Sequence, residues 1–143
     1  MRTRPFDEPM TIAFVAHDNI KWQLLAWADR NKHELRQFRL LATATTGRLL
    51  HNDLGLDVER LASGPLGGDL QLGARIVEGQ VDALMFFWDA LEPQPHDPDV
   101  RSLLRVATLR DVPTACNPAT ADMVLAGLVA LRAAQSPAVQ SVS

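Results

Sequence analysis

Apolar and polar positions along the chain fall into blocks that predict strands and helices in turn. Short apolar runs rich in strand-forming residues are too short for helices, and the stretches between them repeat apolar positions with helical spacing. The predicted strands are residues 11–16, 38–42, 56–62, 81–88 and 112–116. The predicted helices are residues 18–31, 45–52, 69–78, 99–110 and 119–134. In the fourth of these helices, we expect Leu103, Leu104, Ala107 and Leu109 to face inward.

The run Val-Asp-Ala-Leu-Met-Phe-Phe-Trp at 81–88 is the strongest signal for a buried strand. Continuous apolar strands belong to sheets covered on both faces, which are parallel sheets. Five strands that alternate with five helices then predict an α/β fold of three layers: a doubly wound, five-stranded parallel sheet, flavodoxin-like in type. In such folds, ligands bind beyond the carboxyl ends of the strands.

Composition sets the broad class of protein. The 143 residues are enough for one domain, which we place at 1–135, and residues 136–143 are small and polar, as in a disordered tail. A net charge of −3 gives no reason to expect nucleic acid or an anionic membrane as a partner. The single Cys116 excludes an internal disulfide and a multi-cysteine zinc site. With no signal peptide or long apolar span, we expect a cytoplasmic protein.

A glycine-rich loop, Ala-Ser-Gly-Pro-Leu-Gly-Gly-Asp at 62–69, follows the third strand and opens the third helix. Three glycines and a proline exclude a helix or strand interior, and backbone N–H groups at such a point favour an anion. Asp69 then has two readings. The general preference for Asp at helix starts favours an N-cap, and the alternative is a base held beside a bound anion.

Polar residues follow the other strands too, and therefore gather at one edge of the predicted sheet. They are His17, Asp18, Asn19 and Lys21 after the first strand, Thr43, Thr45 and Thr46 after the second, Asp89, His96 and Asp99 after the fourth, and Asn117 after the fifth. Each has a structural reading: Thr45 or Thr46 as a helix cap, Asp99 in a first helical turn, Lys21 in solvent. Their joint placement at strand ends favours a functional reading.

These residues resemble the methylglyoxal synthase family over about residues 12–122. The matching blocks are 15–18 with Lys21, 43–47, 63–69, 86–89, 95–100 and 117–122. Two features are together highly specific for this family. They are the block Ser-Gly-Pro-Leu-Gly-Gly-Asp at 63–69, and Trp-Asp at 88–89 followed by Pro-His-Asp-Pro-Asp at 95–99.

The resemblance implies the conversion of dihydroxyacetone phosphate to methylglyoxal and inorganic phosphate, without a metal or organic cofactor. Proton abstraction next to a carbonyl needs a carboxylate base, and Asp69 matches the family's base. His96 is suited to polarise the carbonyl as it becomes an oxyanion, and Asp99 to orient His96 or share its proton. His17 and Asp18 line the pocket, and Asp89 orders the acidic cluster.

The substrate's phosphate needs donors that offset the repulsion of these carboxylates. The residues that match the family's phosphate site are His17, Lys21, Thr43, Thr45, Thr46, Ser63, Gly64 and His96. The family also implies a homo-oligomer, a hexamer, and inhibition by phosphate. Two positions depart from its pattern: Ala44 replaces a glycine, which would strain the backbone if φ were positive there, and the short C-terminus offers no clear arginine to a neighbouring subunit.

Other classes explain fewer of the residues. A ligand-binding regulatory domain of the same fold, as in carbamoyl phosphate synthetase, needs the phosphate loops but not Asp69, His96 and Asp99 together. A phosphoacceptor receiver domain needs a lysine after the fifth strand, which here ends in Cys116-Asn117. A metal hydrolase could use the His and Asp residues, but it leaves the phosphate loops unexplained.

Overall fold

A parallel five-stranded sheet forms the centre of the computed structural model, which describes residues 8–63, 66–91 and 100–135. The strands run in the order β3-β2-β1-β4-β5, and every pairing between neighbours is parallel. Their bounds are β1 Thr11–Ala16, β2 Arg39–Ala42, β3 Val58–Arg60, β4 Ala83–Phe87 and β5 Thr114–Ala115. The predicted strands 56–62, 81–88 and 112–116 are therefore longer than the hydrogen-bonded strands at their centres.

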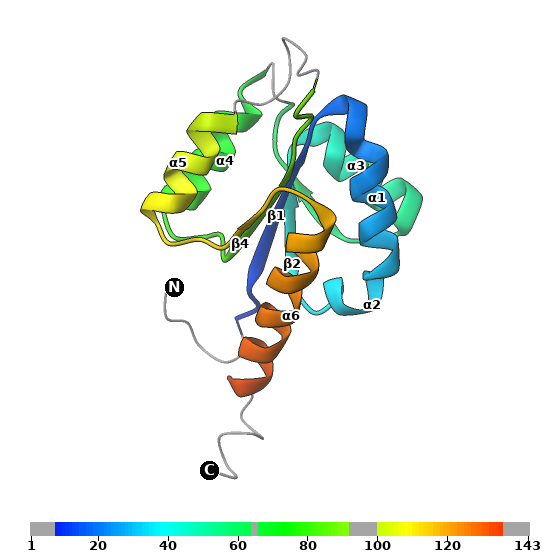
Figure 1. Cartoon of the computed structure of the whole chain (residues 1–143), viewed down its shortest axis with the longest axis vertical. Coiled ribbons are helices and arrows are strands. Elements are labelled where there is room, and N and C mark those ends of the chain that lie inside the picture. The colour runs from blue at the N-terminus through cyan, green and yellow to red at the C-terminus, as the bar shows by residue number, and fades with distance from the viewer. Residues whose placement is uncertain (1–7, 64–65, 92–99, 136–143) are drawn as a thin grey trace.

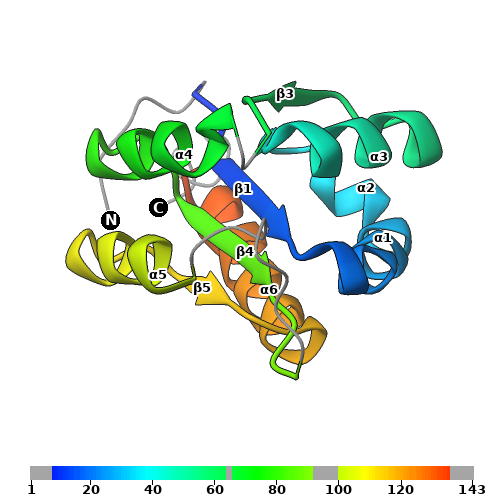
Figure 2. The ribbon, with the colours of Figure 1, turned by 90° about the horizontal axis from the view of Figure 1, so that it is seen from above.

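Helices cover both faces of the sheet. They are η1 Asp18–Ile20, α1 Lys21–Arg30, α2 Lys32–Leu35, α3 Ala44–Leu54, α4 Gly68–Val77, α5 Val100–Leu109 and α6 Pro118–Ala134. Figures 1 and 2 show α4 and α5 on one face and α1, α2, α3 and α6 on the other. The predicted three-layer, doubly wound α/β fold is confirmed.

The side chains of β1 alternate between two cores. Ile12 and Phe14 pack with α1, α3 and α6, whereas Ala13 and Val15 pack with α4 and α5. All six residues of β1 and all five of β4 are buried, as a strand covered on both faces requires. The continuous apolar run at 81–88 therefore does belong to a parallel sheet.

The change of helix face locates the topological switch point. The connections β1–β2 and β2–β3 run through α1, α2 and α3 on one face, and the connections through α4 and α5 lie on the other. Strands β1 and β4 are neighbours in the sheet, yet their following connections leave in opposite directions. In sheets of this kind, ligands bind at the carboxyl ends of such a strand pair.

Several expectations from the sequence need correction. The predicted helix 18–31 is two pieces, η1 and α1, because the chain first forms a tighter turn at η1. A separate short helix, α2, follows α1 and buries Leu35. Leu109 is exposed rather than inward, because it lies two residues after the buried Ala107, about 200° around α5 and so on its opposite face. Leu103 and Ala107 are buried as expected, and Leu104 is half-buried.

Some expectations fall on residues that the structure does not describe. The tail at 136–143 and the start of the predicted helix at residue 99 lie outside the described residues, and the domain boundary stays a prediction. Within the described ranges, no helix is long and apolar enough to cross a membrane.

An ion pair joins β3 to α4 at the end of the sheet away from the switch-point edge. Arg75 donates through both terminal nitrogens to the carboxylate of Glu59. This hydrogen bond lowers the pKa of Glu59, helped by the charges of Arg75 and Arg39 and opposed by desolvation.

We predict that Glu59→Gln lowers the free energy of unfolding near pH 7 by about 0.2–1 kcal/mol, the usual range for exposed pairs. Because the folded pKa of Glu59 is depressed, its contribution is complete above the unfolded pKa and is lost as the pH falls through the folded pKa. Urea unfolding of both proteins across the acid range checks this. A difference that persists unchanged at the lowest pH would contradict it.

Candidate active site

His17 lies at the switch point, as the first residue after β1. Its main-chain N–H donates to the carbonyl of Phe87 at 2.9 Å, which extends the pairing of β1 with β4 by one step. Its imidazole is buried and meets the ring of Phe86 edge-on, with centroids 5.7 Å apart. The main-chain N–H of Asp89 donates to Nδ1 of His17 at 3.0 Å. Residues 72 positions apart are thus joined at the predicted edge.

Asp89 is held by its side chain as well. Its Oδ1 accepts the main-chain N–H of Leu91 at 2.9 Å, and its Oδ2 accepts the side-chain amide of Asn19 at 3.1 Å. Asn19 lies in η1, directly after His17 and Asp18. From the sequence, Asn19 is expected at this strand end, but no role can be predicted for it, because its hydrogen-bond partner lies 70 residues away. Its only signal in the sequence is that it follows His17-Asp18 at a strand end.

Lys21 brings a positive charge to the carboxyl end of β1. Its Nζ donates to the carbonyl of Ala16 at 2.7 Å and to Oδ1 of Asp18 at 2.6 Å. The Lys21 side chain is 14% exposed and that of Asp18 is 47% exposed. Lys21 is therefore not a solvated helix side chain, and its ammonium is positioned at the strand end.

The segment after β2 presents hydroxyl groups at the start of a helix. Thr43 is the N-cap of α3, with no hydrogen bond from its side chain, so neither Thr45 nor Thr46 is the cap. Thr46 is buried, and its hydroxyl oxygen has no hydrogen-bond partner in the part of the chain that the structure describes. An 11-residue helix that begins here carries partial positive charge at this end. The segment is suited to bind an anion.

Ala44 fits this segment without strain. It is the first residue of α3, and among the described residues Asp111 alone combines a side chain with a positive φ. The methyl group that distinguishes Ala44 from the family's glycine therefore imposes no backbone penalty of that kind.

The glycines of the loop at 62–69 have separate tasks. Gly67 is the N-cap of α4 and has φ +97°, a left-handed conformation that other residues resist. Gly68 lies so close to the preceding chain that a Cβ there would be 2.1 Å from the carbonyl oxygen of Ala62. Two N–H groups, those of Leu66 and Gly68, donate to the carbonyl of Ser63 and close the turn.

Asp69 is a first-turn residue of α4 rather than its N-cap, which corrects the structural reading favoured from sequence. The reason is that Gly67 takes the left-handed conformation and begins the helix two residues earlier. One carboxylate oxygen of Asp69, Oδ1, is buried. A carboxylate in a first turn is stabilised by the helix dipole, so Asp69 is compatible with a charged base.

The described residues of the predicted site therefore follow the carboxyl ends of four strands. They are His17, Asp18 and Lys21 after β1, Thr43, Thr45 and Thr46 after β2, Ser63 and Asp69 after β3, and Asp89 after β4. Gly64, His96 and Asp99 lie outside the described residues, so their placement stays a prediction. Over the ranges 8–63, 66–91 and 100–135, no group of three or more His, Cys, Asp or Glu side chains is arranged to hold a metal ion.

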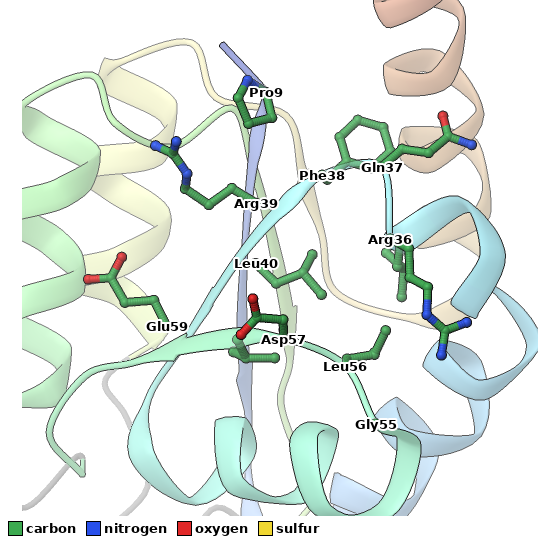
Figure 3. Close-up of a pocket in the computed structure, with 12 residues that line it drawn as sticks. Pro9, Arg36, Gln37, Phe38, Arg39, Leu40, Gly55, Leu56, Asp57 and Glu59 are labelled. Carbon is green, nitrogen blue, oxygen red and sulfur yellow. The ribbon is translucent and has the colours of Figure 1, made fainter. Parts of the chain in front are cut away.

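A cavity of about 730 Å³ lies at the other end of the sheet, beside the amino ends of β2 and β3. Figure 3 shows its charged side chains, among them Arg36, Arg39, Asp57 and Glu59. The two signs of charge are mixed there, and none of the predicted site residues lines this cavity. The predicted chemistry belongs to the opposite edge.

Known proteins share this arrangement and much of this sequence. Residues 23–116 match the family model of the MGS-like domain. The methylglyoxal synthase of Hahella chejuensis is 56% identical over 115 residues, which are 80% of this chain and 75% of that protein. The methylglyoxal synthase of Cellvibrio japonicus is 52% identical over 122 residues, 85% of this chain and 79% of its own. The crystal structure of methylglyoxal synthase from Elizabethkingia anophelis has a TM-score of 0.82 and 48% identity, and the match covers 87% of this chain and 80% of that one.

The close approach at Gly68 yields a prediction with a control in the same helix. Gly68→Ala should lower the free energy of unfolding by about 1–3 kcal/mol, because the added methyl must displace main-chain atoms. Gly73→Ala, where a Cβ meets nothing within 4 Å, should be neutral or stabilise by up to about 1 kcal/mol. Urea unfolding measures both. Equal stabilities of the two variants would contradict the assigned packing.

Proposed function

The chain belongs to the methylglyoxal synthase family, and we propose that it converts dihydroxyacetone phosphate to methylglyoxal and inorganic phosphate. The observation that carries the proposal is the identity of 52–56% to two methylglyoxal synthases over at least three quarters of each. The placement of Asp69, Lys21 and Thr46 after three strand ends of one sheet supports it. The enzyme would then be a carbon–oxygen lyase that acts on a phosphate ester.

In this reaction, Asp69 takes a proton from the hydroxymethyl carbon, next to the carbonyl. The electron pair of the broken C–H bond forms an enediolate with the carbonyl carbon. Its collapse breaks the bond between the other methylene carbon and the phosphate oxygen, so inorganic phosphate leaves with that electron pair. The enol that remains gains a proton on its methylene carbon and loses its hydroxyl proton, which gives methylglyoxal. The proton that Asp69 took passes to the released phosphate, which regenerates the carboxylate, so atoms and charges balance without a redox step.

The phosphate group is assigned to Lys21 and to the segments after β2 and β3. A helix N-terminus and a positioned ammonium attract a dianion, and they offset the repulsion from nearby carboxylates. The buried hydroxyl of Thr46 supports this assignment. It has no hydrogen-bond partner among the described residues, and the free-energy cost of such a buried polar atom can be offset by a bound anion. Thr43, Thr45, Ser63 and Gly64 complete the proposed phosphate site. The same groups also stabilise phosphate as it leaves.

The remaining polar residues serve the carbon skeleton. We assign His96 to the carbonyl oxygen, where a donor stabilises the developing negative charge, and Asp99 to the orientation of His96. His17 and Asp18 line the pocket, and Asp89 orders it. Product phosphate should compete with substrate for the same site, and by family resemblance we infer a cytoplasmic homohexamer.

Replacing the proposed base should abolish most of the turnover without unfolding the protein. For Asp69→Asn we predict a kcat lower by roughly 10²–10⁴-fold, the range for loss of a general base. Circular dichroism and phosphate binding should remain close to those of the parent chain. The rate of methylglyoxal formation from dihydroxyacetone phosphate measures the effect. A near-normal kcat would remove Asp69 as the base.

Removing the ammonium at the end of β1 should weaken binding of the phosphate group. For Lys21→Met we predict a KM and a phosphate inhibition constant raised by about tenfold or more, as for a lost charged hydrogen bond. Lys32→Met is the matched control, because Lys32 pairs with Asp29 on the surface, 3.2 Å away. An unchanged KM in Lys21→Met, or an equal effect in the control, would refute this role.

A further inference from the structure

The hydrogen bond between Asp89 and His17 restricts the protonation of the imidazole. A main-chain N–H can only donate, so Nδ1 of His17 must present a lone pair to it. In a neutral imidazole, the proton then lies on Nε2, and an imidazolium would lose this bond. The geometry thus selects one tautomer of a buried ring, with its donor on Nε2.

The position of that N–H depends on how the Asp89 carboxylate is held. Oδ1 accepts the N–H of Leu91, which forms a local turn, and Oδ2 accepts the amide of Asn19. The first bond shapes the loop, but only the second ties the loop to the segment that carries His17. The acceptor is a carboxylate, so the bond from Asn19 is of the stronger, charge-assisted kind.

Asn19 and His17 belong to one hydrogen-bonded turn. The carbonyl of His17 accepts the N–H of Ile20 at 3.1 Å, which closes the turn that contains Asn19. The bonds therefore form a closed ring, from His17 to the Asp89 main chain, through its side chain to Asn19, and back along η1 to His17. In a closed ring, each bond restrains the geometry of the others.

We propose that Asn19 is a positioning residue, which holds Asp89 so that its main-chain N–H keeps His17 in the Nε2–H tautomer. Asn19 acts through Asp89 and need not touch the substrate. The consequence for catalysis rests on the proposed function, in which His17 lines the substrate pocket.

The test combines a spectroscopic readout with kinetics. Asn19→Asp replaces the amide donor with an acceptor of nearly the same shape, whose charge repels the Asp89 carboxylate. The matched control is Asn52→Asp, the same change at an exposed position on α3. Long-range ¹H–¹⁵N correlation spectra at neutral pH report the tautomer, and a His17→Gln variant assigns the signals of His17. Urea unfolding checks that each variant is folded.

We expect the parent chain and Asn52→Asp to show His17 with a proton on Nε2 and none on Nδ1. Asn19→Asp should show a mixture of the two tautomers. Its kcat/KM for dihydroxyacetone phosphate should fall by about tenfold, which corresponds to about 1.4 kcal/mol of transition-state stabilisation. Asn19→Ala, which removes the donor without adding a charge, should change both readouts in the same direction.

Several outcomes would overturn the proposal. A parent His17 protonated on Nδ1 would contradict the selection of the tautomer. A single Nε2–H tautomer that persists in both Asn19 variants would show that Asn19 does not impose it. A mixed tautomer with unchanged kcat/KM would refute the catalytic consequence. The spectra do not depend on turnover. A parent chain that is inactive on dihydroxyacetone phosphate would therefore refute the proposed function, and the spectra would still decide whether Asn19 sets the tautomer of His17.

Discussion

The parallel pairing of β1 with β4 is the constraint on which the rest of the site depends. Its register runs from Ile12 opposite Ala83 to Ala16 opposite Phe87, and the N–H of His17 adds one further bond. Both strands therefore end at the same level, between two layers of helices. Because the connections that follow them leave toward opposite faces, the two strand ends stay side by side. His17 and Asp89 meet there for this reason.

Charge is distributed unequally between the two ends of the sheet. At the carboxyl edge, α3 and α4 both begin, so two helix N-termini add positive potential near Lys21. That potential stabilises carboxylates such as Asp69 and, in the proposed function, the phosphate. At the amino end, Glu59 and Arg75 neutralise each other, and the cavity beside them mixes both signs. The fold thus provides an edge suited to bind an anion without a strongly charged chain.

The sequence shows the order of the elements most clearly at the central strands β1 and β4, which must be apolar on both faces. The runs 11–16 and 81–88 are recognisable for that reason, and the residues that follow them can be assigned to one edge. The sequence does not show the order of the strands in the sheet, because that order depends on packing between segments that are far apart in the chain. The cap of α4 is a similar case: Asp69 is the better cap by type, but Gly67 adopts the left-handed conformation that begins the helix earlier.

Long-range hydrogen bonds are the part of the site that no local pattern reveals. The bonds of Lys21 to Ala16 and Asp18 are local, yet they depend on the turn at η1, which the predicted helix 18–31 does not include. Asn19 has no local signal beyond its place after His17-Asp18, since the Asp89 carboxylate that binds it follows another strand. The roles of residues that act through such contacts follow from the three-dimensional structure and not from a local sequence pattern.

The central claim is that this edge of the sheet binds dihydroxyacetone phosphate and eliminates its phosphate. The most direct measurement follows methylglyoxal and inorganic phosphate together in one reaction of the purified chain with this substrate. The account predicts their release in equal amounts, at a rate proportional to the protein added. Binding of phosphate without release of either product would contradict it, and would indicate a ligand-binding domain of the same fold.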